Sequence, residues 1–117
     1  MRVIDDYAHH PTEIEALLRT ARGVAQERGG RVLVLFQPHL FSRTRAFADR
    51  FGQALALADA VVVTDVYPAR ETQADFPDIT GDTVAQRVPG GIARFVAERL
   101  DAAHAVADLA RPDDLLL

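Results

Sequence analysis

Short, unbroken apolar runs constrain the fold of this chain most strongly. Residues 32–36 read Val-Leu-Val-Leu-Phe, and residues 61–63 are three consecutive valines. A strand that is apolar at every position, rather than at every second one, is typical of a parallel sheet covered on both faces. Both runs are far shorter than the roughly 20 residues that a bilayer requires, so the sequence predicts no membrane span.

Helical patterns separate these runs. We expect strands over 2–4, 31–37, 60–65, 92–97 and 114–117, and helices over 11–28, 43–57, 80–87 and 98–110. Strands that alternate with helices predict an α/β fold with three layers and a mostly parallel sheet flanked by helices. The first helix has two possible starts, at Pro11 or at a capping box of Thr12 and Glu15. The buried stripe expected in the last helix is Leu100, Ala103, Ala107 and Ala110.

Length and composition exclude several classes of protein. A chain of 117 residues fits one domain, over 1–117. The net charge of -4 argues against a nucleic-acid binder. The absence of cysteine excludes disulfides and cysteine-ligated zinc. The first residues lack the apolar core of a secretory signal, so we expect a cytoplasmic protein. Neither a glycine-rich phosphate loop nor a nucleophile elbow occurs, which predicts no complete catalytic apparatus in this chain.

Three polar segments follow predicted strands, at 5–13, 37–45 and 65–71. In a parallel sheet with helices on both faces, ligands gather at the carboxyl ends of the strands. The topology therefore predicts that these segments form one ligand site.

The first segment contains Asp5, Asp6, Tyr7, His9 and His10. A carboxylate at a strand end can accept hydrogen bonds from ribose hydroxyls, and the first turn of the next helix offers N–H groups to an anion. A solvated turn whose two histidines cap the helix is an equally good interpretation. A metal site is not expected, because adjacent histidines point in different directions and no third ligand has a recognisable spacing.

Two arginines near a helix start mark the second segment. Arg43 and Arg45 stand where the helix dipole repels cations, and guanidinium groups bind carboxylates and phosphates in a bidentate way. Simple exposure of both arginines is the alternative, which these residues alone slightly favour. In the third segment, Asp65 and Tyr67 could support the site, although turn chemistry explains them nearly as well.

Taken together, the three segments resemble the C-terminal domain of the Mur ligases, in particular the branch that adds L-alanine. The resemblance rests on DDYAHHPTE at 5–13, on FQPH at 36–39 followed by SRTR at 42–45, and on DVYPARE at 65–71. Order and separation agree, and the resemblance covers nearly the whole chain. It implies a Rossmann-like fold and one domain of a three-domain, ATP-dependent, amide-forming ligase of peptidoglycan synthesis.

The family's reaction activates the carboxylate of UDP-N-acetylmuramate as an acyl phosphate, which the amine of L-alanine then attacks. The resemblance implies that the UDP sugar, ATP and magnesium are held mainly by two other domains, so this chain alone is not expected to turn over. The family's domain also continues past residue 117 into a glycine-rich segment, so we expect a piece truncated at its C-terminal end.

The resemblance also implies roles for individual residues. Asp6 and Tyr7 match positions that face the nucleotide, and Tyr7 also borders the amino-acid pocket. His9 and His39 match positions near the incoming amino acid. Arg43 matches a basic residue that holds the carboxylate of L-alanine.

One departure concerns charge. Leu40 stands where many relatives have a basic residue, which leaves Arg45 as a possible second charge. Two rival functions stay open: the murein tripeptide-recycling ligase, which the QPH sequence at 37–39 argues against, and a non-catalytic small-molecule-binding module. A plain α/β domain with solvated loops is the third alternative.

Overall fold

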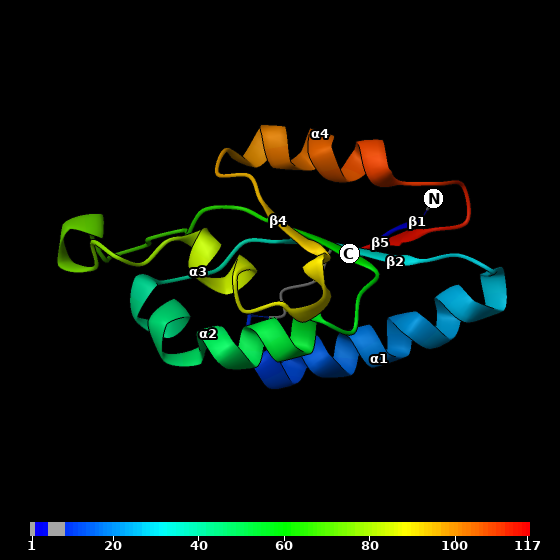
Figure 1. Ribbon diagram of the computed structural model, residues 1–117, viewed down its shortest axis with the longest axis horizontal. Coiled ribbons are helices and arrows are strands. Elements are labelled where there is room, and N and C mark those ends of the chain that lie inside the picture. Colours follow the sequence, from blue (N-terminus) through cyan, green and yellow to red (C-terminus); the bar gives the residue numbers. More distant parts are fainter. Residues whose placement is uncertain (1, 5–8) are drawn as a thin grey trace.

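The computed structural model describes residues 2–4 and 9–117 (Figure 1). Within these residues, five strands form one sheet and four α-helices pack on it. The strands are β1 (Arg2–Val3), β2 (Val32–Phe36), β3 (Ala60–Val63), β4 (Ala93–Phe95) and β5 (Leu115–Leu116). The helices are α1 (Pro11–Arg28), α2 (Phe41–Leu55), α3 (Gly81–Ala85) and α4 (Arg99–Leu109).

The sheet has the strand order β1-β5-β2-β3-β4, and every pairing within it is parallel. In its centre, Leu35 of β2 lies opposite Val62 of β3. The last strand in sequence, β5, lies between β1 and β2 rather than at an edge. These pairings confirm the predicted α/β architecture.

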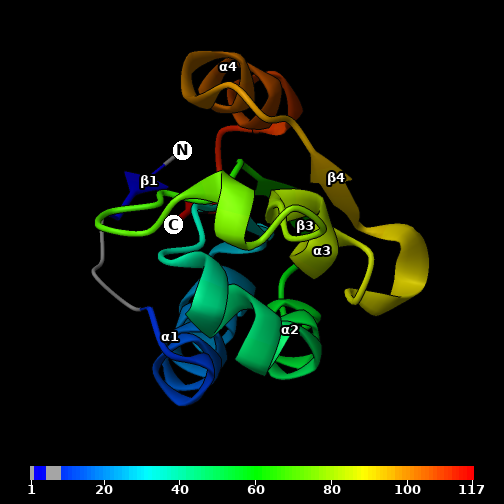
Figure 2. The ribbon, with the colours of Figure 1, turned by 90° about the vertical axis from the view of Figure 1, so that its left-hand side faces the viewer.

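Helices cover both faces of the sheet, as Figure 2 shows with α1 and α2 below the strands and α4 above them. On the lower face, Leu18 of α1 and Phe51 of α2 pack with Val34 of β2 in the main core. On the upper face, Ala102 and Val106 of α4 pack on Leu33 and Val62. Because Val34 faces one layer and Leu33 the other, β2 must be apolar throughout, as its sequence predicts.

The predicted buried stripe of the last helix is wrong for Leu100 and Ala107, although Ala103 and Ala110 are partly buried and Ala110 packs on the upper core. Leu100 is 66% exposed and Ala107 is also exposed, whereas Ala102 and Val106 are fully buried. Alanine is frequent around this helix, so several faces have nearly the same apolar character, and the side chain of Val106 against the sheet decides which face is buried.

The helices α1 and α2 begin in different ways. The α1 helix starts at Pro11, and the backbone N–H of Thr12 donates to Nδ1 of His10 at 3.3 Å, so the structure selects the first of the two predicted starts. The α2 helix starts at Phe41, two residues before the predicted start. Its preceding residue, Leu40, has a φ of 67° and provides no side-chain cap.

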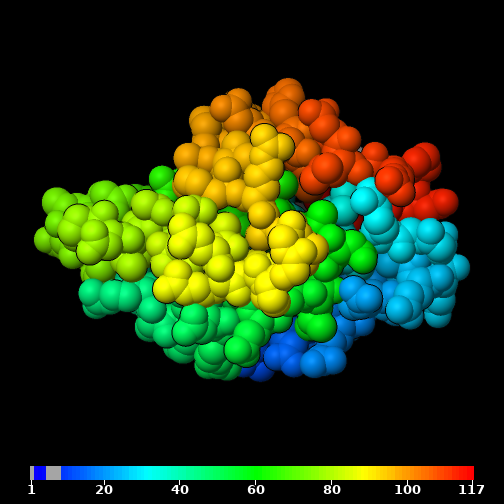
Figure 3. Space-filling view, viewed as in Figure 1, coloured from blue at the N-terminus to red at the C-terminus, as the bar shows by residue number. Residues whose placement is uncertain are grey.

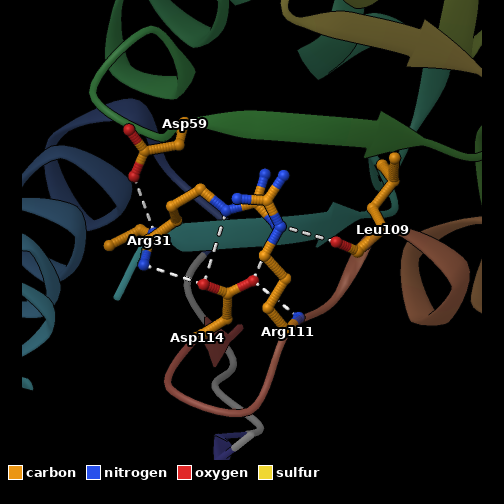
Figure 4. A network of polar contacts seen from close by, with 6 residues as sticks. Arg31, Asp59, Leu109, Arg111 and Asp114 are labelled. Atoms are coloured by element: carbon orange, nitrogen blue, oxygen red, sulfur yellow. Dashed lines mark hydrogen bonds and ion pairs between the residues drawn. The ribbon is translucent and has the colours of Figure 1, made fainter. Parts of the chain in front are cut away.

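A buried carboxylate ties β2 to β5 where these parallel strands begin (Figure 4). We call this end of the sheet its amino edge, and the end where the strands finish its carboxyl edge. Asp114, 2% exposed, accepts hydrogen bonds from the backbone N–H and guanidinium of Arg31 and from the backbone N–H of Arg111. Burial opposes ionisation of this carboxyl, but the hydrogen bonds from Arg31 and Arg111 outweigh it and lower the pKa of Asp114 to about 2. Asp59 likewise accepts from the N–H of Val32.

A segment between β3 and α3 projects from one end of the molecule, on the left of Figure 1 and of the space-filling view in Figure 3. It contains a 3-10 turn at Gln73–Asp75. Among the described residues, no helix is both long enough and apolar enough to cross a membrane.

Candidate functional site

A hollow of about 600 Å³ lies at the carboxyl end of β2. Its floor is apolar and includes Leu18, Val34 and Phe36. Its polar lining comes from three connections of the chain: the segment before α1, the segment from the end of β2 into the first turn of α2, and the start of α4. The polar residues are His9, Gln37, His39, Arg43 and Arg99.

The structure brings together three residues predicted to bind substrate, His9, His39 and Arg43. Partial burial of the His39 ring, together with repulsion from His9 and Arg43, lowers the pKa of His39 below its ordinary value. An anion bound among these groups would relieve the repulsion, so the site is electrostatically suited to a carboxylate or a phosphate.

The polar groups that line the hollow are basic or neutral. None of its described lining residues is an aspartate or a glutamate, and Arg43 forms no ion pair with any residue in 2–4 or 9–117. Within the same residues, no group of three potential metal ligands gathers. Imidazole and guanidinium groups thus dominate the rim.

Two loops that follow neighbouring strands are joined at the rim. His39 and Tyr67 form an isolated parallel bridge, in which the N–H of Leu40 donates to the carbonyl of Tyr67 at 2.9 Å. The N–H of Tyr67 donates in turn to the carbonyl of Pro38 at 2.8 Å. The rings of His39 and Tyr67 also pack together, with centroids 5.4 Å apart. The backbone of the second loop therefore sets the position of His39.

Three predicted supporting residues lie outside the lining of the hollow. The guanidinium of Arg45 lies over the ring of Phe76, 4.9 Å from its centroid. The carboxylate of Asp65 accepts from the backbone N–H groups of Val66 and Gly81 and so ties the third segment to α3. Tyr67 does not line the hollow but contacts the rim through the ring of His39 and through its backbone hydrogen bonds to Pro38 and Leu40. Arg45 is thus directed to the projecting segment, not to a second position in the hollow.

Asp6 and Tyr7 lie outside the described residues, so their predicted contacts with a nucleotide stay predictions. Gln37 lies in the segment 37–45 that was predicted to contribute to the site but was given no role of its own, and sequence reasoning missed Arg99 entirely. A signal for both existed, because each follows the carboxyl end of a strand, β2 or β4, at the edge where the site was expected.

Comparison with known proteins identifies the family. The family model described as "Mur ligase, glutamate ligase domain" matches residues 1–117. A UDP-N-acetylmuramate--L-alanine ligase of Kineococcus radiotolerans is 61% identical over the whole chain, and a protein of the same name from Cutibacterium acnes is 52% identical over 98% of it. The chain spans 24% of the length of each. This chain therefore belongs to the Mur ligase family.

Proposed function

We propose that this chain is the amino-acid-binding and nucleotide-closing domain of a cytoplasmic, ATP-dependent ligase that joins L-alanine to UDP-N-acetylmuramate in peptidoglycan synthesis. The observation that carries the proposal is the match, along essentially the whole chain, to relatives named for that reaction. The other three quarters of those relatives would correspond to the domains that hold the UDP sugar and ATP.

In this proposal, Arg43 binds the carboxylate of L-alanine. Its guanidinium is in the first turn of α2 and lines the hollow together with His9 and His39. A charge-assisted pair would fix the small zwitterion at its carboxylate and leave the amine to face the activated carboxylate of the sugar substrate. The chain's contribution to the reaction is then positioning rather than proton transfer.

ATP and magnesium would be held mainly outside this chain. Magnesium prefers carboxylate and other oxygen ligands, whereas the described rim offers imidazole and guanidinium nitrogens. The same groups do fit anionic oxygens. Asp6 and Tyr7 are proposed to contact the nucleotide, because they match positions that face the nucleotide in the Mur ligases; in the sequence they stand three and two residues before His9.

The proposal is tested in the full-length ligase that contains this domain, by phosphate release that depends on L-alanine and UDP-N-acetylmuramate. Arg43→Ala should raise the KM for L-alanine by about 10- to 100-fold, since a hydrogen bond between charged groups is lost. The KM for ATP should stay within about twofold.

Arg50→Ala is the matched control, because Arg50 is an exposed arginine two turns further along α2, outside the lining of the hollow. It should leave the KM for L-alanine unchanged. Activity with a free tripeptide but not with L-alanine would overturn the proposal in favour of the recycling ligase. An unchanged KM for L-alanine in Arg43→Ala would remove the role given to this arginine.

A further inference from the structure

The start of α2 places cationic side chains where the helix itself is electropositive. The first turn of this helix contains no acidic residue but does contain Arg43. The residue before it, Leu40, has a φ of 67° and no side-chain acceptor. Non-glycine residues rarely adopt this backbone conformation, because it is sterically unfavourable for a residue with a Cβ. A helix start of this kind needs an acceptor from elsewhere in the chain.

Glu71 provides that acceptor from the loop after β3. The backbone N–H of Ser42 donates to Oε1 of Glu71 at 3.1 Å, and the Ser42 hydroxyl donates to Oε2. Glu71 is 29 residues away in sequence. The hydroxyl of Ser42, and then the N–H groups of Ser42 and Phe41, lower the pKa of Glu71, so the carboxylate is ionised at neutral pH.

The segment that carries His39 and Arg43 is therefore held at two points by one loop. The first point is the bridge between His39 and Tyr67, and the second is the contact between Ser42 and Glu71. Ser42 directly precedes Arg43, so a shift of the first turn of α2 would carry the guanidinium with it. Phe41, buried between these points, stacks on Phe76 of the same loop, with ring centroids 5.8 Å apart.

We propose that Glu71 is a positioning residue for the amino-acid substrate, acting through Ser42 on the placement of Arg43. Glu71 does not line the hollow and would not touch the substrate. The inference rests on the proposed function, because it takes the ligand of Arg43 to be the carboxylate of L-alanine. It assigns to the end of the DVYPARE segment a role in substrate affinity.

The test compares Glu71→Ala, Glu71→Gln and Ser42→Ala in the full-length ligase. Glu71→Ala should raise the KM for L-alanine by about fivefold while the KM for ATP stays within about twofold, because a displaced guanidinium weakens only the grip on the amino acid. Glu71→Gln retains one acceptor oxygen and should recover part of the affinity. Ser42→Ala removes only the hydroxyl bond and should have a smaller effect, about twofold, with little risk to folding.

Glu15→Ala is the matched control. Glu15 is an exposed glutamate that pairs with Arg19 on α1, away from the hollow, and its loss should leave both KM values unchanged. If the wild-type enzyme does not use L-alanine, the proposed function fails. If it does, and Glu71→Ala leaves the KM for L-alanine at the wild-type value or raises both KM values equally, the positioning role is overturned.

Discussion

The two edges of the sheet treat charge in opposite ways. At the amino edge, the carboxylates of Asp59 and Asp114 are satisfied by backbone N–H groups and, for Asp114, by Arg31. At the carboxyl edge, cationic groups cluster around a hollow with no acidic residue in its described lining. At the amino edge, the charged groups therefore hold strands together. At the carboxyl edge, cationic groups face a space that an anion can enter.

The backbone packing of the two edges, by contrast, is alike. A Cβ added at Gly30 would collide with the carbonyl of Asp113 at the amino edge. A Cβ added at Gly81 would collide with the carbonyl of Thr64 at the carboxyl edge. Both edges are built on close backbone contacts, so the difference between them lies in the side-chain charges.

Removal of the buried carboxylate of Asp114 should have the largest effect on stability and tests its role at the amino edge. Asp114→Ala should lower the free energy of unfolding by about 3 kcal/mol, because it leaves the backbone N–H groups of Arg31 and Arg111 without their acceptor and removes the carboxylate that pairs with the guanidinium of Arg31. Urea denaturation of the chain measures the loss. Asp113→Ala, a substitution of the exposed neighbour, should stay within about 0.5 kcal/mol of the wild type. Equal effects of the two substitutions would contradict the assigned role.

The same carboxyl predicts an acid limit. The pKa of Asp114 is lowered from 3.8 to about 2 in the folded state. Its contribution to stability is therefore complete above the unfolded value of 3.8 and is lost as the pH falls through about 2. Urea denaturation at a series of pH values should show a shallower slope of stability against pH in Asp114→Ala, and the slope that remains should come from carboxyls such as Glu71 and Glu98, whose pKa values are also lowered.

Substitution of glycines should have a smaller effect on stability and tests the close backbone contacts at the carboxyl edge. Gly81→Ala should destabilise the chain by about 2 kcal/mol, since its Cβ meets a backbone carbonyl that cannot yield easily. Gly23→Ala should instead stabilise it by about 0.5–1 kcal/mol, because Gly23 lies in α1 with open space around its Cα. Thermal unfolding of both variants checks the two signs, and a shift in the same direction would show that the packing argument is wrong.

The smallest effect concerns the charges of the rim. Arg43→Ala should leave the free energy of unfolding within about 0.5 kcal/mol of the wild type but should raise the pKa of His39, because one of the groups that repel its proton is gone. Titration of the His39 resonances by NMR measures this change. A bound carboxylate should also raise the pKa of His39, so its affinity should increase as the pH falls through the histidine range. A lower pKa of His39 in Arg43→Ala would contradict the electrostatic contact between these two residues.

The sequence was sufficient to predict the order of strands and helices, because the apolar runs and helical stripes are local signals. It was also sufficient to predict that His9, His39 and Arg43 lie at the same end of the sheet, because the topology of parallel strands places the segments that follow them there. It was insufficient for the start of α2, whose cap, Glu71, comes from another loop. Arg99 was not predicted although it follows β4 at the same edge, because residues 96–98, which connect β4 to α4, lack the cluster of polar residues that marks the other three connections.

The bridge between Pro38–Leu40 and Tyr67 has a consequence for motion. Since the N–H of Leu40 and the N–H of Tyr67 each donate across the junction, neither amide can exchange with solvent unless the two loops part. Their deuterium uptake should follow a single opening event with one shared free energy. A ligand held by one loop would then slow exchange in the other, and the rim would open or close as one cooperative unit.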